Sequence, residues 1–150
     1  MTAYELAQRY VGIHELAGNK DHPLIQWWLS LCGFPTDVAD EVAWCSAFVN
    51  GIAWELRLPR SKSAAARSNL LVGRPITLSE AVAEYDVVVL KRGAEPQPGP
   101  EVINAQGHVG FFAGTDSNVV LLLGGNQADG VRIEAFPREK VLGVRRLSED

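Results

Sequence analysis

The spacing of the hydrophobic residues changes at Pro75, and this change limits the folds that the chain can adopt. Before Pro75 the apolar residues recur at the three- and four-residue intervals typical of amphipathic helices. After it, short runs rich in Val, Leu and Phe are separated by turn residues, as in strands. These runs are YDVVVLKR (85–92), GHVGFFAG (107–114), NVVLLLGG (118–125), VRIEAF (131–136) and KVLGVRRL (140–147). Helices followed by strands predict an α+β fold, with N-terminal helices packed on a largely antiparallel sheet.

Start and stop signals divide the N-terminal half into four expected helices. Thr2 and Glu5 have the spacing of a capping box, which opens the first helix. Glycine or proline follows each of the first three helical segments. The expected helices span about residues 2–17, 21–32, 44–58 and 63–73. Between the first two expected strands, the Pro- and Gly-rich segment 93–106 is predicted to form a long loop.

Composition excludes several classes of function. The chain has 150 residues, a net charge of −4 and no run of Lys or Arg, which argues against nucleic acid or an anionic membrane as partner. It shows neither a secretory signal nor an apolar run long enough to span a membrane. The two cysteines predict neither a disulfide framework nor a zinc site. We expect one catalytic domain over residues 1–150, monomeric, without cofactor or metal, and made in a reducing cytoplasm.

Cys45 is the first candidate for chemistry, because the third expected helix begins at Trp44 or Cys45. A cysteine attacks carbonyl carbons as the thiolate, and both a helix N-terminus and a neighbouring imidazole lower the pKa of a thiol. The alternative is a buried core thiol, because Cys45 also lies on the apolar face of that helix with Phe48 and Ile52. A histidine elsewhere in the chain is needed to decide between them.

Only one of the three histidines has a location suited to this role. His14 lies on the apolar face of the first expected helix, which favours a half-buried core residue. His22 precedes Pro23 at a helix start, which favours a turn or cap. His108 opens a strand directly after the long loop, where it can face a helix N-terminus. Asn126, at the end of the next strand, is a candidate for orienting the imidazole, alone or with help from Gln127; a turn role next to Gly125 is equally compatible with its position.

Six blocks of the sequence together resemble phage and prophage peptidoglycan hydrolases of the CHAP and NlpC/P60 group, which are papain-like cysteine peptidases and amidases. The blocks, which occur in this order over nearly the whole chain, are GIHELAGNKDHPLI, DEVAWCSAFVN, SAAARS, VVVLKRG, GHVGFF and LLGGNQ. The resemblance implies a papain-like fold. It also implies that Cys45 is the nucleophile, His108 the base and Asn126 the polar third member.

The sequence departs from the family pattern at two places. Many CHAP relatives have an acidic residue two positions before the asparagine, where this chain has Gly124. Some also bind calcium through alternating acids upstream of the cysteine, whereas Asp37, Asp40 and Glu41 lack that alternation, so no structural calcium is expected. These acids favour a solvated cluster before a helix. Asp40 and Glu41 are also candidates for substrate contact, together with Trp44 and Gln127.

The function expected from these residues is peptidoglycan hydrolysis through a Cys45 thiolate and an acyl-enzyme, with an endopeptidase favoured over an amidase. An endolysin-like enzyme made without a signal would reach the peptidoglycan of the periplasm after release by a holin. The alternatives are a toxin injected into rival bacteria and a non-catalytic module that binds wall fragments or a protein partner.

Overall fold

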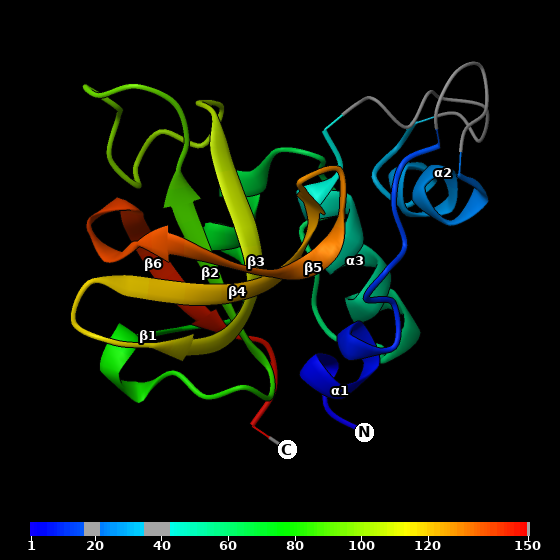
Figure 1. Cartoon of the computed structure of the whole chain (residues 1–150), viewed down its shortest axis with the longest axis horizontal. Helices are drawn as coiled ribbons and strands as arrows, with labels where there is room; N and C mark the ends of the chain where they lie inside the picture. The colour runs from blue at the N-terminus through cyan, green and yellow to red at the C-terminus, as the bar shows by residue number, and fades with distance from the viewer. Residues whose placement is uncertain (17–21, 35–42, 150) are drawn as a thin grey trace.

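The computed structural model describes residues 1–16, 22–34 and 43–149 and has the α+β fold that the sequence predicts. The α-helices lie to one side of a six-stranded sheet, and both ends of the chain lie near the same edge of the molecule (Figure 1). The α-helices are α1 (Ala3–Gln8), α2 (Pro23–Ser30) and α3 (Cys45–Glu55). The strands are β1 (Arg74–Ile76), β2 (Asp86–Lys91), β3 (Gly107–Thr115), β4 (Val119–Gln127), β5 (Gly130–Pro137) and β6 (Val141–Arg146).

The sheet has the strand order β1-β6-β2-β3-β4-β5, and neighbouring strands pair antiparallel. The five strands expected from sequence are present, and the three-residue β1 is an addition that its short length conceals in the sequence. Side chains alternate between the two faces of each strand. Val87, Val89 and Val109 pack toward the helices, whereas Val88, Leu90 and Phe112 join a second apolar cluster. Both faces of the central strands are therefore buried.

Helix α3 lies at the centre of the molecule and packs against β3 and β4. All of its residues from Cys45 to Ala53 are buried, including the polar Ser46 and Asn50. Phe48 contacts the rings of Tyr10, Trp28 and Phe111 edge-on, so the helix joins α2 to the sheet through aromatic packing. Burial on every side holds the N-terminus of α3 in place, and that N-terminus carries Cys45.

The first helix is shorter than the sequence predicts. The capping box forms, with the Glu5 N–H donating to Thr2 Oγ1 at 3.1 Å, but α1 ends at Gln8. Residues 12–15 instead pair with the chain around Gly130: the Gly12 N–H donates to Val131 O at 3.1 Å, and Glu15 N–H to Asp129 O at 2.9 Å. Sheet pairing provides these backbone groups with hydrogen-bond partners that a longer helix would have supplied locally. His14 is therefore exposed, and its prediction as a half-buried helical residue is wrong.

Two further sequence predictions have clear outcomes. His22 caps α2, because its Nδ1 accepts the Leu24 N–H at 3.1 Å, as predicted. The expected fourth helix is present only as a 3-10 helix, η1 (Ala66–Leu71). Within the described residues, no helix has the length and apolar character needed to cross a bilayer.

Candidate active site

Cys45 is the first residue of α3, with Trp44 as the N-cap, as the sequence predicts. Its side chain is 3% exposed. The backbone N–H groups of Val109, the residue after His108 on β3, and of Ser46 and Cys45 lie close enough to the sulfur to lower the pKa of the thiol. The helix N-terminus and the start of β3 therefore meet at this sulfur.

Burial raises the pKa of the Cys45 thiol, and the other influences oppose it. The Val109 N–H lowers that pKa most among them, followed by the positive charge of Arg92 and the N–H groups of Ser46 and Cys45. Because desolvation has the largest effect, the resting side chain is a protonated thiol rather than the standing thiolate expected from the helix N-terminus alone. Nucleophilic attack from this thiol requires a base to accept its proton.

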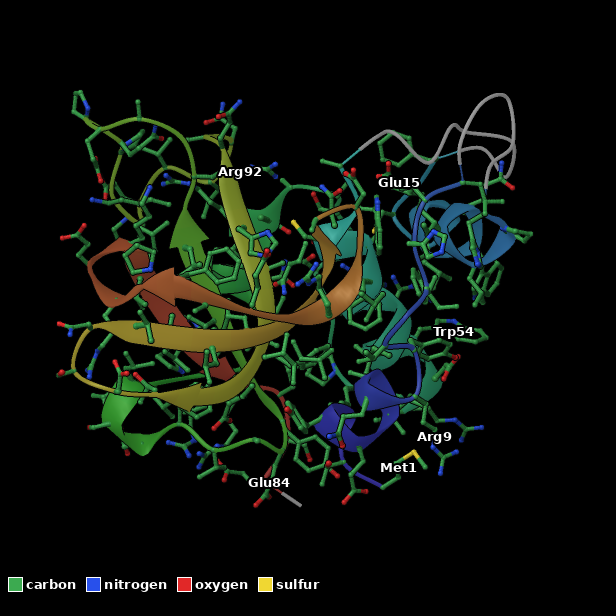
Figure 2. The ribbon with its side chains drawn as sticks, in the orientation of Figure 1. Met1, Arg9, Glu15, Trp54, Glu84 and Arg92 are labelled. Atoms are coloured by element: carbon green, nitrogen blue, oxygen red, sulfur yellow. The ribbon has the colours of Figure 1, made fainter. Side chains whose placement is uncertain are left out.

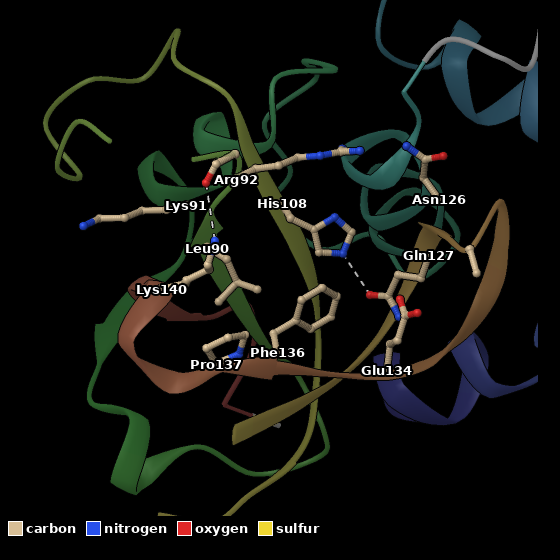
Figure 3. Close-up of a pocket in the computed structure, with 12 residues that line it drawn as sticks. Leu90, Lys91, Arg92, His108, Asn126, Gln127, Glu134, Phe136, Pro137 and Lys140 are labelled. Atoms are coloured by element: carbon tan, nitrogen blue, oxygen red, sulfur yellow. Dashed lines mark hydrogen bonds between the residues drawn. The ribbon is translucent and has the colours of Figure 1, made fainter. Parts of the chain in front are cut away.

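His108 is the second residue of β3, and its ring lies 5.1 Å from that of Phe136. Its Nε2 is 2.9 Å from Oε1 of Gln127 (Figure 3). The Gln127 amide nitrogen donates to the carbonyl oxygens of Leu122 at 3.1 Å and Arg132 at 2.7 Å. These two bonds fix the orientation of the amide, so its oxygen must accept from Nε2–H of His108.

This hydrogen bond determines the tautomer of His108. With the proton on Nε2, the ring nitrogen Nδ1 has a free lone pair and can accept a proton. In Figure 3 this nitrogen is on the side of the ring that faces the Arg92 side chain, away from Gln127. The arrangement is that of a general base held in one orientation by a buried amide.

Gln127, and not Asn126, is the residue that orients His108. In this structure Gln127 takes the place expected for Asn126, because the pairing of β4 with β5 is irregular between Gly124 and Gln127. At this bulge Asn126 has a φ of 58°, and Gln127 is directed into the sheet with 2% exposure. Asn126 points away from the imidazole in Figure 3. Gln127, which was expected to contact substrate, is mainly a support for His108.

The two glycines before Asn126 provide the space for this arrangement. A Cβ atom on Gly124 would lie 2.5 Å from Oε1 of Gln127, and one on Gly125 would lie 2.6 Å from the Trp44 ring. A side chain on Gly124 would displace the Gln127 amide, so the residue without a Cβ at this position and the use of Gln127 are sterically linked.

Trp44 is buried in this structure, and its role in substrate contact stays a prediction. Its side chain is 0% exposed, stacks on Trp28 and donates from Nε1 to Glu15 Oε1 at 2.8 Å. Its role is to fix the chain just before Cys45. Asp37, Asp40 and Glu41 lie outside the described residues, so the predictions about substrate contact and calcium there stay predictions. Within residues 1–16, 22–34 and 43–149, no three His, Cys, Asp or Glu side chains gather as a metal site would require.

Burial also lowers the pKa of His108, and this is the largest influence on that group. The hydrogen bond that His108 donates to Gln127 raises this pKa, and the charge of Arg92 lowers it. The neutral imidazole is therefore favoured near pH 7, and it is the form that accepts a proton from a thiol.

Two adjoining hollows flank these residues. One, of about 340 Å³, is lined by His108, Asn126, Gln127, Glu134, Lys140 and Arg92 among others. The second, of about 410 Å³, is lined by Cys45, Ala64, Ala65, Asn104, Gly107 and Arg92 among others. Arg92 belongs to both. The sequence gives no signal for this role, because the position of Arg92 next to the long loop does not show which way its side chain extends.

The walls of the Cys45 hollow are held by buried polar side chains. Asn69 donates to Ser46 Oγ at 2.9 Å, and Ser46 Oγ donates to Ser63 O at 2.6 Å, which ties the segment around Ala64 to α3. Arg67 is fully buried and binds the long loop. Its Nε donates to Gln106 O at 2.8 Å, and its Nη1 to the carbonyls of Pro98, Gly99 and Val102 at 3.0, 2.7 and 3.2 Å. The SAAARS block is therefore a structural element of this wall.

Comparison with known proteins supports the fold. The three-dimensional structure is similar to that of NlpC1 from Trichomonas vaginalis, with a TM-score of 0.57 and 16% sequence identity. The fold is papain-like. The similarity covers 97% of this chain and 42% of the NlpC1 chain, so this chain spans less than half the length of that protein. No family model matches the sequence, and no curated protein matches it. At this identity the similarity concerns the fold, and the phage and CHAP assignments stay predictions.

Proposed function

We propose that the protein is a cysteine hydrolase that cleaves an amide bond in the peptide part of bacterial peptidoglycan. The observation that carries the proposal is the His108–Gln127 pair, which keeps one imidazole tautomer next to Val109, whose backbone N–H lowers the pKa of the Cys45 thiol, on a strand that packs against α3. The papain-like fold and the resemblance of the sequence blocks to wall hydrolases support the choice of substrate.

In the acylation step, Nδ1 of His108 accepts the proton of the Cys45 thiol as the sulfur attacks the amide carbonyl carbon. The imidazolium then donates this proton to the leaving nitrogen, and the carbon–nitrogen bond breaks. The products are a free amine and a thioester on Cys45. The backbone N–H of Cys45, at the N-terminus of α3, is the proposed donor to the oxyanion.

In the deacylation step, His108 accepts a proton from water as the hydroxide attacks the thioester carbonyl. The carbon–sulfur bond breaks, and the sulfur takes back the proton. One water molecule is consumed for each amide hydrolysed. The His108 ring is buried, and its hydrogen bond to Gln127 keeps it from rotating. The ring nitrogen therefore stays in place in both steps, while the proton moves between His108, the substrate and water.

The proposed setting is that of an endolysin-like enzyme of a bacteriophage or prophage. It would be made in the bacterial cytoplasm, act as a monomer and reach the peptidoglycan of the periplasm through a holin. An endopeptidase is favoured over an amidase. A toxin delivered into rival cells would use the same chemistry. The two settings differ in the accompanying genes: an endolysin-like enzyme is accompanied by a holin gene, and a toxin by a gene for an immunity protein.

Digestion of purified Gram-negative sacculi tests the proposal. We compare the unmodified protein with Cys45→Ala and with the matched control Cys32→Ala, and identify released fragments by mass spectrometry. Digestion by the unmodified protein and by Cys32→Ala, but not by Cys45→Ala, is expected, and the fragment masses identify the bond. Digestion that survives in Cys45→Ala contradicts the mechanism. A folded protein that binds sacculi but releases nothing supports the non-catalytic module instead.

A further inference from the structure

Arg92 follows β2 and is exposed, and it is the residue that the two hollows share. It lines the hollow of His108 and the hollow of Cys45, and its positive charge lowers the pKa of both groups. Figure 3 shows the side chain extending across the site above the imidazole. Within the described part of the chain Arg92 forms no ion pair, whereas the neighbouring Lys91 lies 3.6 Å from Glu95. The guanidinium is thus available to an anion from outside.

The hollow beside His108 has an excess of positive charge, although the whole chain has a net charge of −4. Arg92, Lys91 and Lys140 line it, with Glu134 as the acidic member. Glu134 lies beside Gln127 in Figure 3, away from the Arg92 guanidinium. The ammonium of Lys140 lies on another part of this wall, with its Nζ 3.4 Å from the Gly93 carbonyl oxygen. Such a concentration of positive charge in an acidic protein favours an anionic ligand.

The reaction itself determines which part of a substrate enters this hollow. An imidazolium that protonates the leaving nitrogen must lie on the leaving-group side of the scissile bond. The departing amine therefore occupies the hollow that His108 lines, while the acyl part occupies the alanine-lined hollow of Cys45. A volume of about 340 Å³ is sufficient for a leaving group of amino-acid size.

We propose that Arg92 binds a carboxylate on the leaving-group side of the substrate and thereby selects amides whose departing amine carries a free carboxylate. This inference rests on the proposed function and specifies its substrate. A guanidinium is suited to the task because it binds a carboxylate through two parallel hydrogen bonds.

The first experiment measures carboxylate recognition without any peptide substrate. Iodoacetate and iodoacetamide alkylate the same thiol and differ in carrying a carboxylate or a carboxamide. Their rates at Cys45 are measured by mass spectrometry in the unmodified protein and in Arg92→Gln. Both reagents react with the same thiolate, so a change in the pKa of Cys45 alters both rates equally and leaves their ratio unchanged. We expect the iodoacetate preference to fall roughly fivefold in Arg92→Gln, as removal of a nearby charge predicts.

The matched control is Arg9→Gln, which removes the same charge at the opposite end of the molecule (Figure 2). The reagent ratio at Cys45 should be unchanged in this variant, and the ratio at Cys32 should be unchanged in both. An Arg92→Gln protein with the same ratio as the unmodified protein overturns the proposal, even if sacculi are digested.

The second experiment uses two synthetic peptides that span the bond identified in sacculi, one with a free carboxylate on the leaving residue and one with a carboxamide. We expect the unmodified protein to favour the carboxylate peptide in kcat/KM by on the order of tenfold or more. Arg92→Gln should lose most of this preference, and Arg92→Lys should keep part of it. Equal losses on both peptides overturn the selectivity proposal. If the unmodified protein cleaves neither peptide, the proposed function is contradicted. The alkylation experiment is independent of this result, because it requires no hydrolysis.

Discussion

The imidazole Nε2 of His108 donates to the amide oxygen of Gln127 across 2.9 Å, and both side chains are buried. Two backbone carbonyls hold the amide nitrogen of Gln127, so the amide has a single orientation. The pair therefore determines both where the ring lies and which nitrogen carries the proton. Each prediction below depends on this relationship or on the walls around it.

Replacement of Gln127 should reduce activity much more than replacement of its neighbour. In Gln127→Ala the buried Nε2–H loses its acceptor and the ring can change tautomer, so kcat/KM should fall on the order of tenfold to a hundredfold. Asn126→Ala is the matched control and should have a smaller effect. Initial rates on sacculi measure both. A larger loss in Asn126→Ala would restore Asn126 as the orienting residue.

Activity should depend on pH through a His108 whose pKa lies below the usual 6.5, because burial disfavours its charged form. The base must be neutral to accept the thiol proton, so kcat/KM should rise with a midpoint below 6.5 and then level off. Arg92→Gln should move this midpoint upward, since the charge of Arg92 lowers the pKa of His108. A midpoint above 6.5 in the unmodified protein would contradict the neutral resting imidazole.

The same shift predicts a change of stability with pH. Below 6.5 the unfolded chain binds a proton at His108 more readily than the folded chain does. The contribution of His108 to the free energy of unfolding is thus complete above 6.5 and is lost as the pH falls toward the folded pKa. Urea unfolding at several pH values, compared with His108→Ala, measures it. An equal pH dependence in both proteins would show that His108 has no part in it.

The reactivity of Cys45 should depend on His108. Cys45 and Cys32 are both partly or wholly buried, and burial raises the pKa of Cys32 to about 11. With His108 as the proposed base, Cys45 should react with iodoacetamide near neutral pH roughly tenfold faster than Cys32. His108→Ala should remove this advantage and leave Cys32 unchanged. Equal reactivity of the two thiols in the unmodified protein would refute activation by the imidazole.

Arg67 should be essential for the wall of the Cys45 hollow. Arg67→Met keeps much of the side-chain volume but removes the donors to Gln106 and to the three other loop carbonyls. We expect a loss of about 3 kcal/mol in the free energy of unfolding, because the hydrogen bonds of a fully buried guanidinium to four loop carbonyls are removed. Hydrogen exchange should accelerate over residues 98–107. Unchanged protection of that segment would show that the loop is held by other contacts.

Local sequence signals were sufficient for several parts of the structure. The capping box at Thr2, the start of α3 at Cys45, the cap at His22 and the five longer strands depend on short-range spacing, and each is present. Periodicity was insufficient for α1. Its apolar spacing continues past Gln8, but the chain from residue 12 pairs with Val131 and Asp129, which are remote in sequence.

The sequence alone determined that a cysteine begins a buried helix and that a histidine begins a strand, because both depend on residues nearby in the chain. Only the tertiary structure decided that Gln127 rather than Asn126 supports the imidazole. A one-residue irregularity in a strand exchanges the faces to which its side chains point, and its location depends on the partner strand. The same holds for Arg92, whose place between the two hollows depends on β3 and α3 meeting at the Cys45 sulfur.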